Sequence, residues 1–101
     1  MPAPVSETAE EKAIRVTISG RVQGVWFRAW TQENAQSLGL FGFVRNRHDG
    51  TVDALFKGLP AKVDEMLARC HDGPEMAKVD KVEVSDALGM VPDRFDVKPT
   101  V

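Results

Sequence analysis

The order in which two kinds of apolar periodicity follow one another is the strongest constraint on the fold. Residues 13–19 alternate apolar and polar side chains, which is the period of a strand with one buried face. From Phe27 to Leu38 apolar residues instead recur at helical spacing, and Gly39 is a typical helix end. A glycine-bearing loop at residues 20–26 lies between these segments. The sequence therefore predicts a strand, a loop and a helix in this order.

A hairpin is predicted after the first helix. Residues 42–47 and 51–57 have strand patterns and flank a turn at residues 48–50. Gly50 can adopt the positive φ that short hairpin connections require. These two strands are therefore expected to pair with each other.

A second helix and two further strands complete the pattern. Pro60 suits the first turn of a helix, and Val63, Met66 or Leu67, and Cys70 form one apolar face before Gly73 and Pro74 end it. Residues 77–84 have a strand pattern whose apolar phase changes between Val79 and Val82, which indicates a bulge. A short last strand follows, in which Phe95 and Val97 alternate with Arg94, Asp96 and Lys98.

The resulting order is βαββαβ with a terminal strand. Its most economical arrangement is an antiparallel sheet with two helices on one face, the α+β ferredoxin-like sandwich. Residues 12–101 are expected to form this single domain. Residues 1–11 contain two prolines and no periodicity, so we predict a disordered tail there. Because this fold serves enzymes, ligand sensors and RNA binders alike, it does not identify the function.

Composition excludes several classes of function. A formal net charge of -2 lacks the basic excess of a nucleic-acid binder, and no apolar run is long enough to span a membrane. The chain has one cysteine and two histidines far apart, which argues against a disulfide and against a metal site. With no signal pattern at its start, the protein is expected to be cytoplasmic, without nucleic-acid or membrane partners.

The loop at residues 20–26 is the main candidate for a binding site. A loop between a strand and a helix directs unpaired backbone N–H groups toward one point, where the helix dipole adds positive potential. Arg28, in the first helical turn, can bind two oxygens of the same anion. The loop lacks the Lys-Ser/Thr pair of a nucleotide-binding P-loop, so a single terminal phosphate is the predicted ligand. The candidate loop residues are Gly20, Arg21, Val22, Gln23, Gly24, Val25 and Trp26.

Asn46 is the second candidate. Its side chain shares the parity of Val44, so both point to the same face, but Asn46 lies at the end of its strand. A short amide there can orient a water molecule by donating and accepting hydrogen bonds. Considered separately, Arg28 would be interpreted as a surface arginine and Asn46 as a turn residue. The interpretation of the two as a site therefore depends on their occurrence together.

Two extended motifs carry a family resemblance. Residues 20–28, Gly-Arg-Val-Gln-Gly-Val-Trp-Phe-Arg, resemble the first acylphosphatase signature, and residues 42–58, which open Gly-Phe-Val-Arg-Asn, resemble the second. The separation of the motifs also matches the family pattern. The resemblance covers residues 13–97. Phe43 stands where the family more often has tryptophan or tyrosine, and Trp26 fills a variable position.

The resemblance implies a monomeric hydrolase that cleaves the carboxyl-phosphate bond of small acyl phosphates without a metal or other cofactor. By position, Arg28 binds the substrate phosphate, Asn46 orients the attacking water, and residues 20–26 supply the loop. The alternatives are a non-catalytic ferredoxin-like anion-binding or regulatory domain, and an acylphosphatase-like module of a larger maturation protein. Intact Arg28 and Asn46 favour the enzyme.

Two further residues could carry chemistry. Cys70 lies on the apolar face of the second predicted helix, so a buried thiol is a better interpretation than a nucleophile. His48 lies in the hairpin turn, where an exposed histidine is a better interpretation than a general base. Trp26 is either packed in the loop or placed over the substrate.

Overall fold

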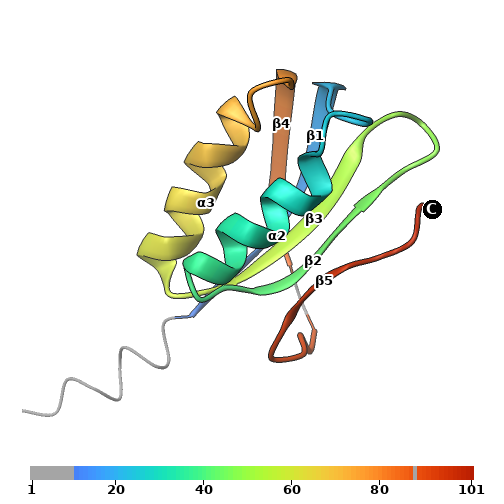
Figure 1. The fold of residues 1–101 in the computed structure, drawn as a ribbon. Coiled ribbons are helices and arrows are strands. Elements are labelled where there is room, and N and C mark those ends of the chain that lie inside the picture. Colours follow the sequence, from blue (N-terminus) through green and yellow to red (C-terminus); the bar gives the residue numbers. More distant parts are fainter. Residues whose placement is uncertain (1–10, 88) are drawn as a thin grey trace, which may run out of the picture.

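The computed structural model describes residues 11–87 and 89–101, and it consists of one sheet with two helices on one face (Figure 1). The strand order is β4-β1-β3-β2-β5. The strands are β1 (Lys12–Arg21), β2 (Phe41–Asn46), β3 (Val52–Gly58), β4 (Lys78–Asp86) and β5 (Phe95–Val97), and the helices are α2 (Phe27–Ser37) and α3 (Pro60–Asp72). The ferredoxin-like prediction is confirmed. Of the predicted tail, residues 1–10 lie outside the described residues.

The direction of β5 corrects the prediction of an antiparallel sheet. β1 pairs antiparallel with β3 and with β4, and β2 pairs antiparallel with β3. β5 pairs parallel with β2, with Gly42 opposite Phe95. β4 ends at the end of the sheet where β2 begins. β5 therefore starts at that end and runs in the same direction as β2. The sheet is therefore mixed.

The irregularity predicted in the strand at residues 77–84 is present in β4. Ser19 pairs with Lys81, and the next residue, Gly20, pairs with Val79, so Asp80 is the extra residue of a bulge. Gly20 has φ 123°, and a Cβ added there would lie 2.2 Å from the carbonyl oxygen of Lys78. Glycine at this position is thus required by strand pairing.

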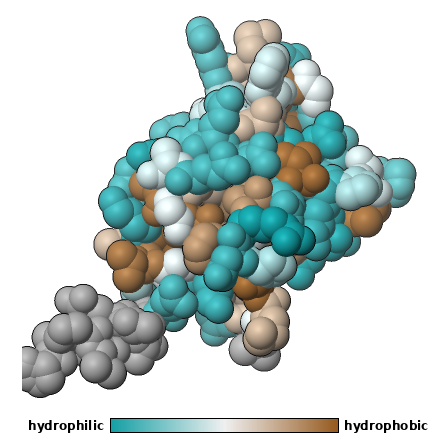
Figure 2. Space-filling view, turned by 60° about the horizontal axis from the view of Figure 1, so that its bottom comes forward, coloured by the Kyte–Doolittle hydropathy of each residue, from teal (hydrophilic) through white to brown (hydrophobic). Residues whose placement is uncertain are grey.

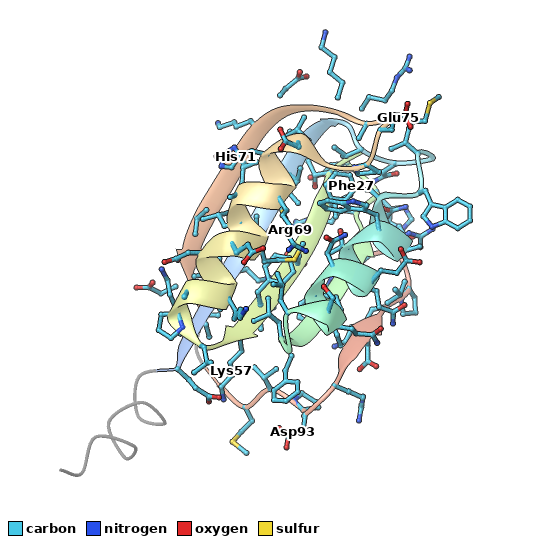
Figure 3. The ribbon with its side chains drawn as sticks, turned by 60° about the vertical axis from the view of Figure 1, so that its left-hand side comes forward. Phe27, Lys57, Arg69, His71, Glu75 and Asp93 are labelled. Carbon is cyan, nitrogen blue, oxygen red and sulfur yellow. The ribbon has the colours of Figure 1, made fainter. Side chains whose placement is uncertain are left out.

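The core lies between the sheet and the helices. β1 and β3 contribute alternate apolar residues to it, and Phe27 from α2 lies between the two helices (Figure 3). Cys70 of α3 is fully buried, which confirms the predicted buried thiol. Burial raises the pKa of this thiol to about 12, so it is not a nucleophile at neutral pH.

The hairpin and the surface agree with the sequence. Residues 48–50 form the turn between β2 and β3, with Gly50 at φ 95°. Hydrophilic residues cover most of the face shown in Figure 2, and hydrophobic residues there form small separate groups. In the part of the chain that the structure describes, no helix has the length and apolar character to cross a membrane.

The sheet face opposite the helices carries a charged cluster. Asp53 of β3 is 1% exposed and accepts hydrogen bonds from both Arg15 of β1 and Arg45 of β2. Phe43 lies beside it, with the cationic groups of Arg15, Arg45 and Lys98 at 5.2, 5.0 and 4.5 Å from its ring centroid. Phenylalanine at this position therefore serves packing on the open face of the sheet.

Candidate active site

The loop between β1 and α2 is curled by two left-handed residues. Gly24 has φ 73°, and Trp26, the residue that precedes α2, has φ 69° and ψ 19°. Gly20 and Arg21, which were predicted as loop residues, instead belong to β1 and pair with Val79 and Lys78. Their pairing with β4 shortens the loop to residues 22–26.

Free backbone N–H groups gather where this loop enters α2. None of the N–H groups of residues 23–29 donates a hydrogen bond to a backbone carbonyl of the described chain, and the first that does is Trp30, to the carbonyl of Trp26 at 3.1 Å. The residue at the helix N-cap, Trp26, makes no side-chain capping hydrogen bond. Unpaired donors beside a positive helix end attract anions.

A pocket of about 400 Å³ opens beside this loop. It is lined by Val22, Gly24, Trp26, Phe27, Arg28, Ala29, Gln32, Asn46 and Val97. The structure thus brings Arg28 and Asn46 to one cavity with three of the predicted loop residues. Gly20, Arg21, Gln23 and Val25 are outside its lining.

Gln23 and Val25 hold the loop in place. The Gln23 side-chain amide donates to the carbonyl oxygens of Arg47 and Thr51, both at 2.8 Å, and so joins the loop to the β2–β3 hairpin. Val25 is partly buried and packs against the core. These contacts place the loop beside the strand that carries Asn46.

Arg28 is half-buried, and its guanidinium has no anionic partner among residues 11–87 and 89–101. It is the second residue of α2. None of the ion pairs among residues 11–87 and 89–101 includes it. An arginine that lines a pocket without a carboxylate is available to bind an anion with two hydrogen bonds.

Asn46 has an unsatisfied buried oxygen. Its Oδ1 is buried and has no hydrogen-bond partner among the described residues. Its backbone is held on both sides, by pairing with Val52 and by the N–H of Val101, which donates to the Asn46 carbonyl at 3.1 Å. Because buried polar atoms are nearly always paired, a molecule in the pocket is the simplest partner for this oxygen.

Gln32 and Val97 line the pocket but were not predicted from the sequence. Gln32 lies one helical turn after Arg28, so its i+4 spacing was a usable signal. Its Nε2 donates to the carbonyl of Phe95 at 3.0 Å, which ties α2 to β5. Val97 had no such signal, because its place depends on the pairing of β5 with β2.

His48, the other candidate near the site, lies outside the pocket lining. It is exposed, and its backbone N–H donates to the carbonyl of Val101 at 2.7 Å. Within residues 11–87 and 89–101, no group of three or more His, Cys, Asp or Glu side chains is arranged to hold a metal ion.

Comparisons with known proteins agree on one family. A family profile described as Acylphosphatase matches residues 14–97. A relative from Rhizorhabdus wittichii, named Acylphosphatase, is 52% identical over 89 residues, which cover 88% of this chain and 90% of the relative. One from Azoarcus sp., with the same name, is 48% identical over 99% of both chains.

A solved structure supports the same relationship. The structure of an acylphosphatase from Coxiella burnetii superposes with a TM-score of 0.86 at 30% identity, and the match covers 97% of this chain and all of that one. Together with the profile match, which spans most of the chain, this similarity shows that the protein belongs to the acylphosphatase family.

Proposed function

We propose that this acylphosphatase hydrolyses the carboxyl-phosphate bond of acyl phosphates at the pocket between the β1–α2 loop and Asn46. One observation carries the proposal: unpaired backbone N–H groups, the unpaired Arg28 guanidinium and the unsatisfied Asn46 Oδ1 belong to one cavity and its rim. Cationic and N–H donors without partners suit the anionic phosphoryl group, and an oxygen acceptor without a partner suits the attacking water.

Arg28 and the loop bind the phosphoryl group. The guanidinium contacts two phosphoryl oxygens, and free N–H groups of the pocket-lining residues in the loop and the first turn of α2 contact the others. Phosphoryl transfer is catalysed mainly by positioning and by stabilising negative charge, so these fixed donors supply most of what it needs. No metal is required for this mechanism.

Asn46 orients the attacking water. Its Oδ1 accepts a hydrogen bond from the water, whose oxygen then forms a bond to phosphorus. The bond from phosphorus to the carboxyl oxygen breaks, and its electron pair leaves with the carboxylate. A carboxylic acid has a pKa of about 4 to 5, so this group departs without a general acid. The substrate phosphate accepts the proton of the water.

The finer properties of the enzyme are part of the same proposal. We expect a cytoplasmic monomer that acts on small molecules, without nucleic-acid partners. An overall charge of -2 and a single buried cysteine are compatible with this expectation. Size-exclusion chromatography with light scattering measures the mass in solution, and a dimer would contradict the monomeric state.

The deciding experiment is hydrolysis of benzoyl phosphate in excess chelator, followed by the loss of its ultraviolet absorbance or by release of phosphate. Turnover well above the uncatalysed rate, inhibited competitively by inorganic phosphate, is the expected result. Phosphate binding without turnover would contradict the proposal and identify an anion-binding domain instead. Turnover that the chelator abolishes would contradict the metal-independent mechanism.

A further inference from the structure

Trp26 combines a strained backbone with an exposed side chain. It is the sole described residue other than glycine with positive φ, at 69°. Bulky side chains rarely adopt this conformation, and glycine would adopt it without strain. The indole does not repay this cost by packing in the core, since Trp26 is 74% exposed. A strained residue that gains little burial is a candidate for a functional role.

The exposed indole lies at the site. Trp26 and Val97, which is 41% exposed, are both exposed apolar residues and both line the pocket that contains Arg28 and Asn46. They come from different segments, the β1–α2 loop and β5. The pocket therefore has apolar surface at its opening as well as polar groups for the phosphate.

The start of α3 shows that an exposed apolar residue before a helix needs no such strain. Leu59 precedes α3 and is 53% exposed, but its φ of −61° and ψ of 136° are ordinary. It lines no part of the Arg28 pocket. The left-handed conformation is thus specific to the residue at the site.

We infer that Trp26 selects the acyl group and that the enzyme prefers acyl phosphates with an aromatic or extended apolar acyl group over acetyl phosphate. The inference rests on the proposed function. With the phosphate bound by the loop N–H groups and Arg28, the acyl group extends toward the opening of the pocket. There the face of the indole packs against an aromatic ring, whereas an acetyl group is too short to gain this contact.

The test compares Trp26→Gly, Trp26→Phe and the native chain. The measured quantity is kcat/KM for benzoyl phosphate divided by kcat/KM for acetyl phosphate. We expect Trp26→Gly to lower this ratio roughly fivefold, the scale of one lost aromatic contact. Trp26→Phe keeps a ring and should retain most of the preference. The inhibition constant of phosphate should stay within about twofold in both variants, because the backbone donors remain.

The melting temperature separates selection from structural support. Trp26→Gly relieves the left-handed strain, so its melting temperature should not fall below that of the native chain. The matched control, Leu59→Gly, should lower the melting temperature without changing the ratio, because glycine there adds flexibility and relieves no strain.

Three results would overturn the inference. An unchanged ratio in Trp26→Gly, or an equal loss for both substrates, would remove the role in selection. A lower melting temperature in Trp26→Gly would show that the indole supports the fold. If the native chain hydrolyses neither substrate, the proposed function fails as well, so the two failures are distinguishable.

Discussion

Arginines on the two faces of the sheet have opposite surroundings. On the open face, the Nε atoms of Arg15 and Arg45 lie 2.7 and 2.9 Å from the two carboxylate oxygens of buried Asp53. On the helix side, Arg28 lines the pocket and takes part in none of the ion pairs within the described residues. The arginines on the open face are thus paired with a carboxylate, whereas the arginine on the helix side has no such partner among the described residues.

The difference separates groups that stabilise the fold from groups that serve the reaction. Burial alone would raise the pKa of Asp53, but its hydrogen bonds and charge interactions with Arg15, and then with Arg45, outweigh burial and lower the pKa below its usual value. That interaction stabilises the folded chain. Arg28 has no such partner among the described residues, so its charge is available to substrate.

Removal of the Arg28 guanidinium should have the largest effect on activity. We expect Arg28→Ala to lower kcat/KM for benzoyl phosphate by roughly 1,000-fold, the scale of an arginine that stabilises a transferring phosphoryl group. Arg28→Lys should not restore activity, because an ammonium does not reproduce the planar fork. Lys62→Ala, an exposed substitution in the first turn of α3, is the matched control and should retain native activity. Activity above a tenth of native in Arg28→Ala would contradict the assigned role.

Asn46→Ala should lower kcat by about 100-fold while phosphate still inhibits at a similar concentration. The reason is that Asn46 contacts the water, whereas the loop and Arg28 contact the phosphate. Steady-state kinetics with phosphate as inhibitor separates the two effects. Parallel loss of turnover and phosphate binding would argue that Asn46 supports the pocket and does not orient the water.

Asp53→Asn should reverse this pattern, with a loss of stability and no loss of activity per folded molecule. We expect the free energy of unfolding to fall by about 2 kcal/mol, less than for a fully buried ion pair, because both arginines remain partly exposed. Urea denaturation measures this change. A large fall in kcat/KM of the folded variant would show that the two faces of the sheet are coupled.

The same carboxylate predicts the acid side of the stability profile. Because the folded-state pKa of Asp53 is lowered, its contribution is complete above the unfolded value of about 4 and is lost as the pH falls through the folded value. Urea midpoints measured at successively lower pH should fall more steeply for the native chain than for Asp53→Asn. Parallel curves would show that another carboxylate dominates acid unfolding.

Gln23→Ala should have the smallest effect. It removes two hydrogen bonds between the loop and the hairpin, so we expect a loss of stability of about 1 kcal/mol and a several-fold higher inhibition constant for phosphate. The loop N–H groups would be held less firmly around the anion. Unchanged phosphate inhibition would show that the positive φ values of Gly24 and Trp26 are sufficient to shape the loop.

Several parts of the fold and the site could be predicted because they depend on neighbouring residues. The order of the elements followed from periodicity, and the phase change between Val79 and Val82 correctly indicated the bulge. The parity of Asn46 and the position of Arg28 in the first helical turn agree with their common pocket. Their roles in catalysis stay predictions until the variants are measured.

Other features depend on contacts between distant segments. The assignment of Gly20 to the loop was wrong because β4, which lies far along the chain, pairs with it and extends β1. The parallel direction of β5, and with it the place of Val97, depends on where β4 ends relative to β2. The apolar periodicity within one segment does not indicate which distant strand pairs with it or in which direction that strand runs.

The amino-acid sequence by itself determined the family, the order of the elements and the two residues central to the proposed reaction, since these depend on local patterns and motif spacing. Only the tertiary structure decided which N–H groups, oxygens and charges lack partners. Arg15 is bound because the pairing of β1 with β3 brings it beside Asp53, whereas Arg28 lines a pocket that no carboxylate of the described residues lines. The two side chains are chemically the same, so the sequence alone does not predict this difference. The strain at Trp26 likewise appears only in the folded backbone.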